Sequence, residues 1–385
     1  MFNLISFIFA LSFFYKFDLI GSLYLSQLII VVLFIYYFQK IKFVIFPKNF
    51  FIICLIFLLS QIISDIINST EFNNYIRGWI KIFITILSFI TFFIIASYEN
   101  KKIQIILFWI IFISLCFYSL IDFKSFEYSW KFGLANNFLI LILLILSFKK
   151  IDIKNIKLIV FIIIISISFI SLFFGARSTF LLSSVLLFHL FLLKNNNNNK
   201  NILKKIILFT PILIFVILFF YNFIYTNFSL SENLIRKYSI QTGDLGIFLG
   251  GRSELLASYK AIIDKPIWGH GSWASNCEYV YFLKEQLELY NYQKYIDIYN
   301  CRIPSHSVIL GYWVEAGIFG FIFWLYFLNL IIKSYLIELQ KPTYSSPLKL
   351  FLIFLSIWDI LFSPFGGTRM IILPLYLAII TSKQD

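Results

Sequence analysis

The chain has 385 residues, of which 60% are hydrophobic, 21% are aromatic and only 13% are charged. This composition excludes an ordinary soluble domain, in which about half of the residues are apolar and about a quarter are charged. The formal net charge is +13. It does not indicate nucleic-acid binding, because cytoplasmic lysines are the first explanation of a basic surplus in a membrane protein. We therefore expect an all-α polytopic membrane protein surrounded by membrane lipids, with no nucleic-acid partner.

The apolar residues lie in blocks of roughly 16 to 25, the helix length that crosses a ~30 Å hydrocarbon layer. Strands of a membrane barrel would alternate polar and apolar residues, and these blocks do not alternate. The first block has no basic leader and no small-residue cleavage site, which favours a span over a signal peptide. The pattern predicts about twelve spans, near residues 1–16, 19–38, 49–67, 77–96, 102–121, 132–148, 157–173, 178–194, 203–224, 306–332, 347–362 and 367–381.

The distribution of lysine predicts the orientation of the spans. With the N-terminus in the cytoplasm, most lysines fall in cytoplasmic segments and few fall in the short outer loops, as the positive-inside rule requires. Both termini are then cytoplasmic. Residues 1–224 hold the first nine spans, residues 225–305 form one large outer loop, and residues 306–385 hold the last three spans.

The large loop is expected to have structure of its own, since long loops in compact proteins are usually functional or folded. SELLASYKAIIDKPIWGHG predicts a short helix that stops at Pro266 before a glycine turn, and FLKEQLELYNYQKYIDIY predicts a second, amphipathic helix. Together they would form a small helical cap over the outer face. Cys277 and Cys301 both lie in this loop, where an oxidising compartment permits a disulfide; two free thiols are the alternative.

Arginine is rare in this chain, and the predicted topology places every arginine on the outer side of the membrane. Its planar fork binds phosphate bidentately and stays charged when partly dehydrated, so outer arginines predict an anion site for a phosphate or diphosphate near the outer membrane face. Snorkelling to the interface or pairing with loop acids is the alternative, and it explains Arg236 and Arg302 at least as well. In this topology all six arginines are on the outer side: Arg77, Arg177, Arg236, Arg252, Arg302 and Arg369.

Arg177 is the first candidate for that site. FFGARSTFLLSS places it after a glycine turn, in the first turn of the eighth span, where the helix dipole disfavours a cation. A bound anion would reverse this penalty, since the free N–H groups of a helix start also attract phosphate. Ser178 and Thr179 would add hydroxyl donors. Ionisable residues at membrane depth are functional by default.

Three further arginines are candidates for the same anion. Arg252 opens the loop helix in GDLGIFLGGRSELLASYK, where glycines allow close approach of the backbone to a ligand, although P-loop spacing is absent. Arg369 follows the Gly-Gly turn of SPFGGTRMIILP and enters the last span. Arg77, with Lys81 one turn later, begins the fourth span, and interfacial anchoring explains this pair equally well.

The chain has three histidines, His189, His270 and His306. No metal-ligand spacing connects them, so we expect no metal and no cofactor. His306 begins the tenth span and has two open roles, a helix cap or a general base, which imidazole suits because its free pKa lies near working pH. We expect His270 to be a turn residue and His189 to be interfacial.

Two stretches, GGRSELLASYKAIIDKPIWGHG and PSHSVILGYWVEAGIFGFIFW, resemble the signature region of the bacterial O-antigen ligase and polymerase superfamily. In that family an Arg-led loop helix ends in Pro-x-x-Gly-x-Gly, and a His-Asn or His-Ser pair leads a span carrying Glu-x-Gly-x-x-Gly. GARSTFLLSS is similar to an earlier Arg-containing span start, and KFGLANNFLILIL to a Gly-x-x-Asn-Asn stretch. The corresponding residues are Arg252, Pro266, Gly269, Gly271, His306, Ser307, Glu315, Gly317 and Gly320.

The resemblance implies a GT-C-like fold and an inverting, metal-independent glycosyl transfer on the periplasmic face of the bacterial inner membrane. The donor would be a glycan on undecaprenyl diphosphate. Arg177 and Arg252 would hold the diphosphate and neutralise its charge as it leaves, and His306 would activate the acceptor hydroxyl. Loop aromatics would stack on sugar faces: Trp268, Trp273, Tyr279 and Tyr281.

The acceptor stays open at this point. Ligases of the family usually show His-Asn, whereas this chain has His306-Ser307, so both a lipid A-core and a second lipid-linked repeat, the acceptor of a polymerase, are expected. Glu315 lies nine residues after His306, on the opposite helical face, and we expect it to be structural. A transporter of lipid-linked oligosaccharides would also be polytopic and basic, but it would favour two similar halves or broken helices at mid-membrane, which the sequence lacks.

Overall fold

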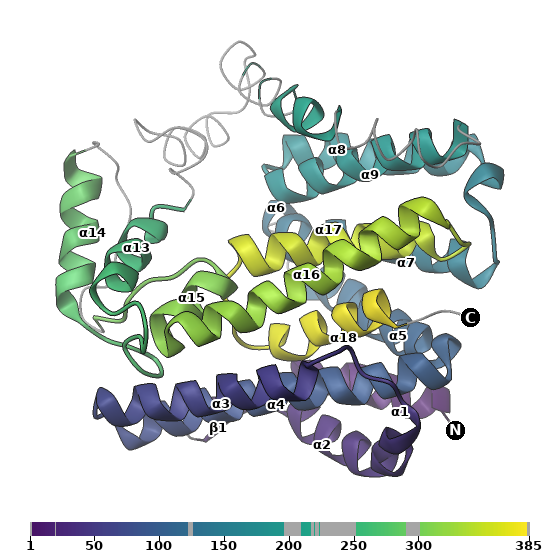
Figure 1. Ribbon diagram of the computed structural model, residues 1–385. Helices are drawn as coiled ribbons and strands as arrows, with labels where there is room; N and C mark the ends of the chain where they lie inside the picture. Colours follow the sequence, from purple (N-terminus) through teal and green to yellow (C-terminus); the bar gives the residue numbers. More distant parts are fainter. Residues whose placement is uncertain are drawn as a thin grey trace.

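The computed structural model describes residues 2–19, 21–121, 126–195, 209–216, 219, 223, 252–289 and 301–382. Within these ranges the chain is almost entirely helical (Figure 1). The first half contains α1 (Phe2–Leu11), η1 (Ser12–Phe14), β1 (Lys16–Leu19), β2 (Gly21–Tyr24), α2 (Leu25–Tyr37), η2 (Phe38–Phe43), α3 (Phe50–Ile67), α4 (Phe72–Tyr98) and α5 (Asn100–Ile121). The remainder contains α6 (Phe126–Ser129), η4 (Trp130–Leu134), α7 (Ala135–Phe148), η5 (Ile153–Asn155), α8 (Leu158–Phe173), α9 (Arg177–Asn195), α13 (Glu254–Asp264), α14 (Cys277–Leu289), α15 (Val308–Ala316), α16 (Ile318–Gln340), α17 (Ser346–Phe362) and α18 (Arg369–Thr381).

The prediction of an all-α polytopic membrane protein is confirmed. Six helices of the described residues are long and apolar enough to cross a membrane: Leu25–Phe43, Phe50–Ile67, Phe72–Tyr98, Asn100–Ser119, Arg177–Lys194 and Ile318–Gln340. Shorter apolar helices cover Phe2–Phe14, Ala135–Phe148, Leu158–Phe173 and Arg369–Thr381. The number of twelve spans stays a prediction, and most of the expected ninth span, 203–224, lies outside the described residues.

Two of the expected spans differ from the structure. Residues 16–19 and 21–24 pair as two antiparallel strands, in which Lys16 lies opposite Tyr24, so the second helix begins only at Leu25. The segment 306–332, expected as one span, is divided in the structure, because its helix breaks at Gly317, whose φ is 69°. The break gives a short α15 and a long α16, and it results from the backbone packing described below.

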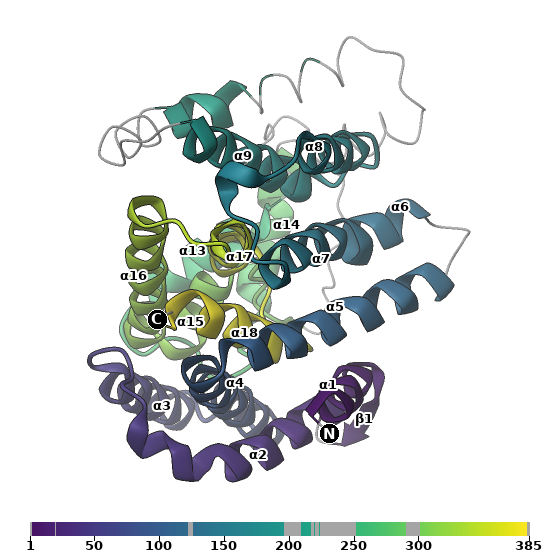
Figure 2. The ribbon, with the colours of Figure 1, turned by 90° about the vertical axis from the view of Figure 1, so that its right-hand side faces the viewer.

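The helices pack around α4 and α17. α4 is the most deeply buried of the six long helices and contacts α2, α3, α5 and α18. Figure 2 shows α17 end-on among α7, α9, α16 and α18, all of which contact it. A single apolar core runs through this bundle, and it includes Phe89, Trp324 and Phe351.

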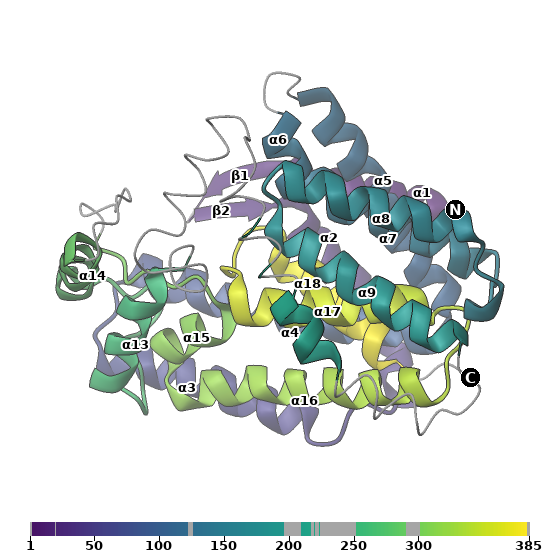
Figure 3. The ribbon, with the colours of Figure 1, turned by 90° about the horizontal axis from the view of Figure 1, so that it is seen from above.

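The two ends of the bundle differ. The start of α1 and the end of α18 lie at one end, and α13 and α14 lie at the other (Figures 1 and 3). α13 and α14 have a small core of their own, in which Ala261, Tyr279 and Leu283 pack against Val314 of α15. The helical cap expected from the sequence is therefore present in the described part of the loop. α14 begins earlier than expected, at Cys277, where the Asn276 side chain accepts a hydrogen bond from Glu278 N.

Candidate functional site

The two signature stretches bind to each other through their backbones. His270 N donates to Val314 O at 2.7 Å, and Ile318 N donates to Ile267 O at 3.2 Å. A Cβ atom on Gly269 would lie 2.6 Å from Gly317 N, and one on Gly317 would overlap Ile267 O. Both glycines also have positive φ, a region that L side chains rarely adopt. The glycines are therefore required for this close contact, which fixes the loop against the start of α16.

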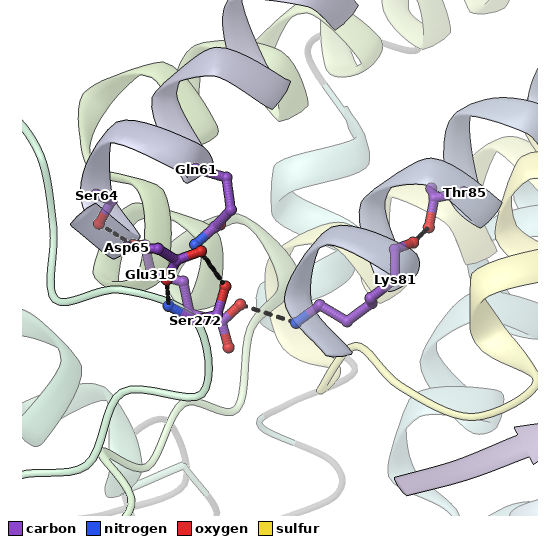
Figure 4. Close-up of polar contacts among 7 residues, drawn as sticks. All are labelled: Gln61, Ser64, Asp65, Lys81, Thr85, Ser272 and Glu315. Atoms are coloured by element: carbon purple, nitrogen blue, oxygen red, sulfur yellow. Dashed lines mark hydrogen bonds and ion pairs between the residues drawn. The ribbon is translucent and has the colours of Figure 1, made fainter. Parts of the chain in front are cut away.

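Side chains of α3 secure the same contact from the other side (Figure 4). Ser60 Oγ donates to Ala316 O at 2.6 Å, and Ser64 Oγ donates to Glu315 O at 2.8 Å. Asp65 accepts hydrogen bonds from Ser272 N at 2.6 Å and from Ser272 Oγ at 2.8 Å. The two serine hydroxyls satisfy carbonyl groups that α15 leaves open at its end, and Asp65 ties the loop to α3, so the loop, α3 and α15 form one hydrogen-bonded frame.

Ser307, and not His306, is the cap of α15. Ser307 Oγ accepts a hydrogen bond from Leu310 N at 3.3 Å and lies 3.4 Å from Ile360 O of α17, to which it donates. His306 stands one residue before the cap, with 43% of its side chain exposed. The helix-cap role left open for His306 is therefore wrong, because that role belongs to its neighbour.

The last turn of α17 holds two of the predicted arginines. The Arg252 guanidinium lies 4.7 Å from the Trp358 ring centre and 4.4 Å from that of Phe362, so its charge lies against both aromatic rings. Arg369 begins α18, as expected, and its Nε lies 3.4 Å from Asp359 Oδ1. Asp359 partly neutralises the charge of Arg369.

Arg177 begins α9 after a tight turn at Gly175. Ala176 N donates to Ser171 O at 2.8 Å and Gly175 N donates to Leu172 O at 3.1 Å, the paired bonds with which a glycine in the left-handed region ends a helix. Thr179 is fully buried, and its hydroxyl donates to Asn136 Oδ1 at 3.1 Å. Its expected role as a ligand donor is therefore replaced by a contact between α7 and α9.

Arg177 and Arg252 are close enough to influence each other. Burial lowers the pKa of Arg252, and the Arg177 charge lowers that pKa further, while Glu254 raises it. Two neighbouring arginines in a partly buried site repel each other. The arrangement favours binding of an anion between them, and Arg252 remains charged because a free guanidinium loses its proton only above about pH 12.

Glu254 connects the arginines to His306, and the sequence analysis missed it. Its Oε1 lies 3.9 Å from His306 Nδ1, and its side chain is 18% exposed. Glu254 is the first residue of α13, a place where acids are common because the helix dipole favours them. The signal that could have found it is its position two residues after the candidate Arg252.

Arg77 does not join this group. Arg77 lies in the second turn of α4, next to Trp273. The Cζ of Arg77 is 5.9 Å from the centre of the Trp273 ring. Lys81, one turn later, is buried, and its Nζ forms an ion pair of 2.9 Å with Glu315 Oε2 (Figure 4). Glu315 is therefore structural, as expected, and Lys81 is part of the frame and not an interfacial anchor.

The other histidines and the loop cysteines have clear surroundings. His270 lies in the glycine turn, and its Nε2 donates to Ala261 O at 2.8 Å. His189 is fully buried and lies 2.7 Å from the Tyr335 hydroxyl, so it faces other helices of the bundle, and its depth in the membrane stays a prediction. The structure joins Cys277 and Cys301 in a disulfide. No group of three His, Cys, Asp or Glu side chains among the described residues is arranged to hold a metal ion.

The comparison with known families agrees with the sequence motifs. Residues 160–325 match the family model described as O-antigen ligase. The matched segment contains Arg177, Arg252 and His306, whereas Arg77 and Arg369 lie outside it. The resemblance drawn from the motifs is confirmed by this match. No curated protein and no solved structure matched the chain.

Proposed function

From the place of residues 160–325 in the O-antigen ligase superfamily, we propose that this protein is a membrane-embedded glycosyltransferase of the ligase type. It moves a glycan from undecaprenyl diphosphate to a sugar hydroxyl of a lipid A-core acceptor. The reaction takes place at the α13 end of the bundle, which is the periplasmic face of the inner membrane in the topology that lysine predicts. The transfer inverts the anomeric centre and needs no metal.

One observation carries this proposal. Arg177 and Arg252 influence each other electrostatically, and Glu254, two residues after Arg252, lies 3.9 Å from His306. These contacts support the proposal, because two arginines suited to a phosphate and a histidine suited to act as a base are then neighbours at one end of the bundle. A diphosphate leaving group needs the first and an attacking hydroxyl needs the second.

The residues have distinct roles in the reaction. His306 takes the proton of the acceptor hydroxyl as its oxygen attacks the anomeric carbon of the donor. The bond from that carbon to the phosphate oxygen breaks, and undecaprenyl diphosphate leaves with the electron pair. Arg177 and Arg252 stabilise the charge that develops on the leaving group. Glu254 stabilises the imidazolium that His306 becomes, as the third group of a triad does.

The residue after His306 does not distinguish a ligase from a polymerase. Ser307 caps α15, and Asn is an equally good N-cap residue, so His-Ser and His-Asn are equivalent at this position. The departure from the usual ligase pair therefore has a structural explanation. A second lipid-linked repeat remains the acceptor under the polymerase alternative.

A transfer assay tests the proposal. Purified protein in liposomes receives undecaprenyl-diphosphate-linked glycan and lipid A-core, and the product is measured after separation. We expect transfer by the wild type, no transfer by His306→Ala, and unchanged transfer by Lys284→Gln, an exposed control. Activity should persist in EDTA. Retained activity in His306→Ala would exclude it as the base, and movement of the lipid without transfer to any acceptor would indicate a transporter.

The surface glycan of a deletion strain separates the two acceptors. Unmodified core together with accumulated lipid-linked polymer supports the ligase. Single repeats left on the core would instead indicate a polymerase with the same chemistry.

A further inference from the structure

Three cations surround Trp273, away from the residues assigned above. The Cζ of Arg302 lies 3.9 Å from the centre of the Trp273 ring, and that of Arg77 lies 5.9 Å from it. Lys81 Nζ is 5.7 Å from the same ring and 4.6 Å from the Tyr312 ring. Energetically significant cation–π contacts occur about once in 70–80 residues, so three on one ring mark this site as unusual.

The charges of this cluster do not balance. Glu315 neutralises Lys81 through their ion pair. Neither Arg77 nor Arg302 has a carboxylate within ion-pair distance among the residues that the structure describes. Both guanidinium groups lie against Trp273, so they are no more than about 10 Å apart, a distance at which like charges still repel at moderate salt. The two guanidinium charges of the cluster are therefore without an ion-pair partner among the described residues, although the buried Asp65 carboxylate lies near by, bonded to Ser272.

The cluster also contains donors without acceptors. Arg77 Nε, Trp273 Nε1 and the Tyr312 hydroxyl are buried and have no hydrogen-bond partner in the described part of the chain. Leaving a buried donor without an acceptor is unfavourable, and a bound acceptor would remove that cost. Trp273 in addition has a φ of 55°, in a region that is strained for a bulky residue and is found mainly at ligand and active sites.

We propose that Arg77, Arg302 and Trp273 bind an acidic group of the acceptor saccharide, a phosphate or a carboxylate carried on a sugar. This inference rests on the proposed transferase function and names a chemical property of its acceptor. The two guanidinium groups neutralise the acidic group, and Trp273 keeps Arg302 in place and adds an aromatic surface for the sugar. Arg302 is exposed and Trp273 is half-buried, so an acceptor has access to both.

α15 connects this cluster to the proposed base. Its cap, Ser307, follows His306 and contacts α17 near the Arg252 site. Farther along the helix, Tyr312 and Glu315 contact Lys81 of α4. Arg302 itself lies four residues before His306. An acceptor held at Trp273 and a donor held at Arg252 would thus occupy two sides of one short helix, with His306 at its start.

Binding without a donor tests the proposal independently of transfer. Wild-type protein in detergent is titrated with glucose 6-phosphate, glucuronate, glucose and inorganic phosphate at constant ionic strength. We expect both acidic sugars to bind at least roughly ten-fold more tightly than glucose and inorganic phosphate. The double variant Arg77→Gln/Arg302→Gln should lose at least roughly ten-fold of that affinity, and Lys284→Gln, which also removes a loop charge, should lose none. Equal binding of all four compounds, or unchanged binding in the double variant, would overturn the proposal.

Two further measurements separate the sources of the anion. In nanodiscs, a loss of phosphatidylglycerol binding in the double variant, with sugar phosphate binding unchanged, would assign the site to a lipid headgroup and contradict the inference. In the transfer assay, the double variant should raise the KM of the acceptor and leave that of the donor unchanged, and removal of acceptor phosphates should abolish the difference from the wild type. If acidic sugars bind as expected and no transfer occurs, the transferase proposal fails and the binding site stands.

Discussion

Glu254 Oε1 lies 3.9 Å from His306 Nδ1 across the junction between the loop helix α13 and the start of α15. The two residues are far apart in the chain and come from the two signature stretches. A carboxylate on Nδ1 leaves Nε2 as the nitrogen that faces a reacting hydroxyl. The pair therefore assigns an orientation to the proposed base.

Replacing Glu254 with Gln tests this orientation. The change keeps the size of the side chain and removes the charge, so the imidazolium formed during transfer loses its stabilisation. We expect a fall in kcat of about ten-fold or more, a displacement of the acidic limb of the pH–rate profile to lower pH, and little change in the donor KM. Glu254→Asp should recover part of the activity. An unaltered pH profile in the Gln variant would show that Glu254 has only a packing role.

Arg252 and Arg177 should respond differently to conservative replacement. Arg252→Lys keeps a charge but loses the planar group that lies against Trp358 and Phe362, so we expect little rescue over Arg252→Gln. Either change should reduce kcat/KM by roughly 100-fold or more, as for other preorganised donors to a developing anion. Arg177→Lys should retain more activity than Arg177→Gln. Steady-state kinetics with purified donor measures both series, and full activity in either Gln variant would remove that arginine from the site.

Gly317 should not tolerate a side chain. Its φ is 69°, and a Cβ atom would overlap Ile267 O, so Gly317→Ala must separate the loop from α16. We expect a large loss of thermal stability or of folded protein, as measured by size-exclusion chromatography and thermal unfolding in detergent. Gly366→Ala is the matched control, because no atom lies within 4 Å of its added Cβ. Equal stability of the two variants would contradict the described contact.

The buried pair of Lys81 and Glu315 gives a stability prediction. Lys81→Met leaves the Glu315 carboxylate buried without its cation, which costs about 3–5 kcal/mol, whereas removing both charges is much less costly. The double variant Lys81→Met/Glu315→Leu should therefore be more stable than either single variant. A thermal-unfolding comparison of the four proteins measures this coupling. If the loss of stability in the double variant equals the sum of the losses in the two single variants, Lys81 and Glu315 do not interact directly.

His270 predicts a dependence of stability on pH. Burial lowers its pKa below the ordinary value, with Lys265 contributing, while the Ala261 carbonyl and Asp264 oppose the shift. The unfolded chain then binds more protons than the folded one below about pH 6.5. Stability should therefore fall as the pH decreases from about 7 toward 5, and His270→Gln should weaken this dependence. Thermal unfolding across this pH range measures it, and an identical pH dependence in the variant would be contrary to the prediction.

Much of the molecule could be predicted from single residues. Arg177 after a glycine turn, Arg369 at the start of the last helix and a loop helix that ends before Pro266 all follow from local rules of helix termini. The pairing of β1 with β2 was missed because the same apolar residues suit a strand or a helix over so short a run. Thr179 was misassigned because its partner, Asn136, lies on another helix.

The sequence by itself determined that the chain lies in a membrane and that its motifs resemble those of a ligase-type superfamily. Composition and spacing suffice for these conclusions because the bilayer acts on each segment separately. Only the tertiary structure decided that Ser307 is the cap and His306 is not, that Glu254 lies beside His306, and that Arg77 belongs with Trp273 and Arg302 and not with Arg252. These pairings depend on how helices that are distant in the sequence pack together. The free energy of a buried charge or donor depends on the groups that surround it.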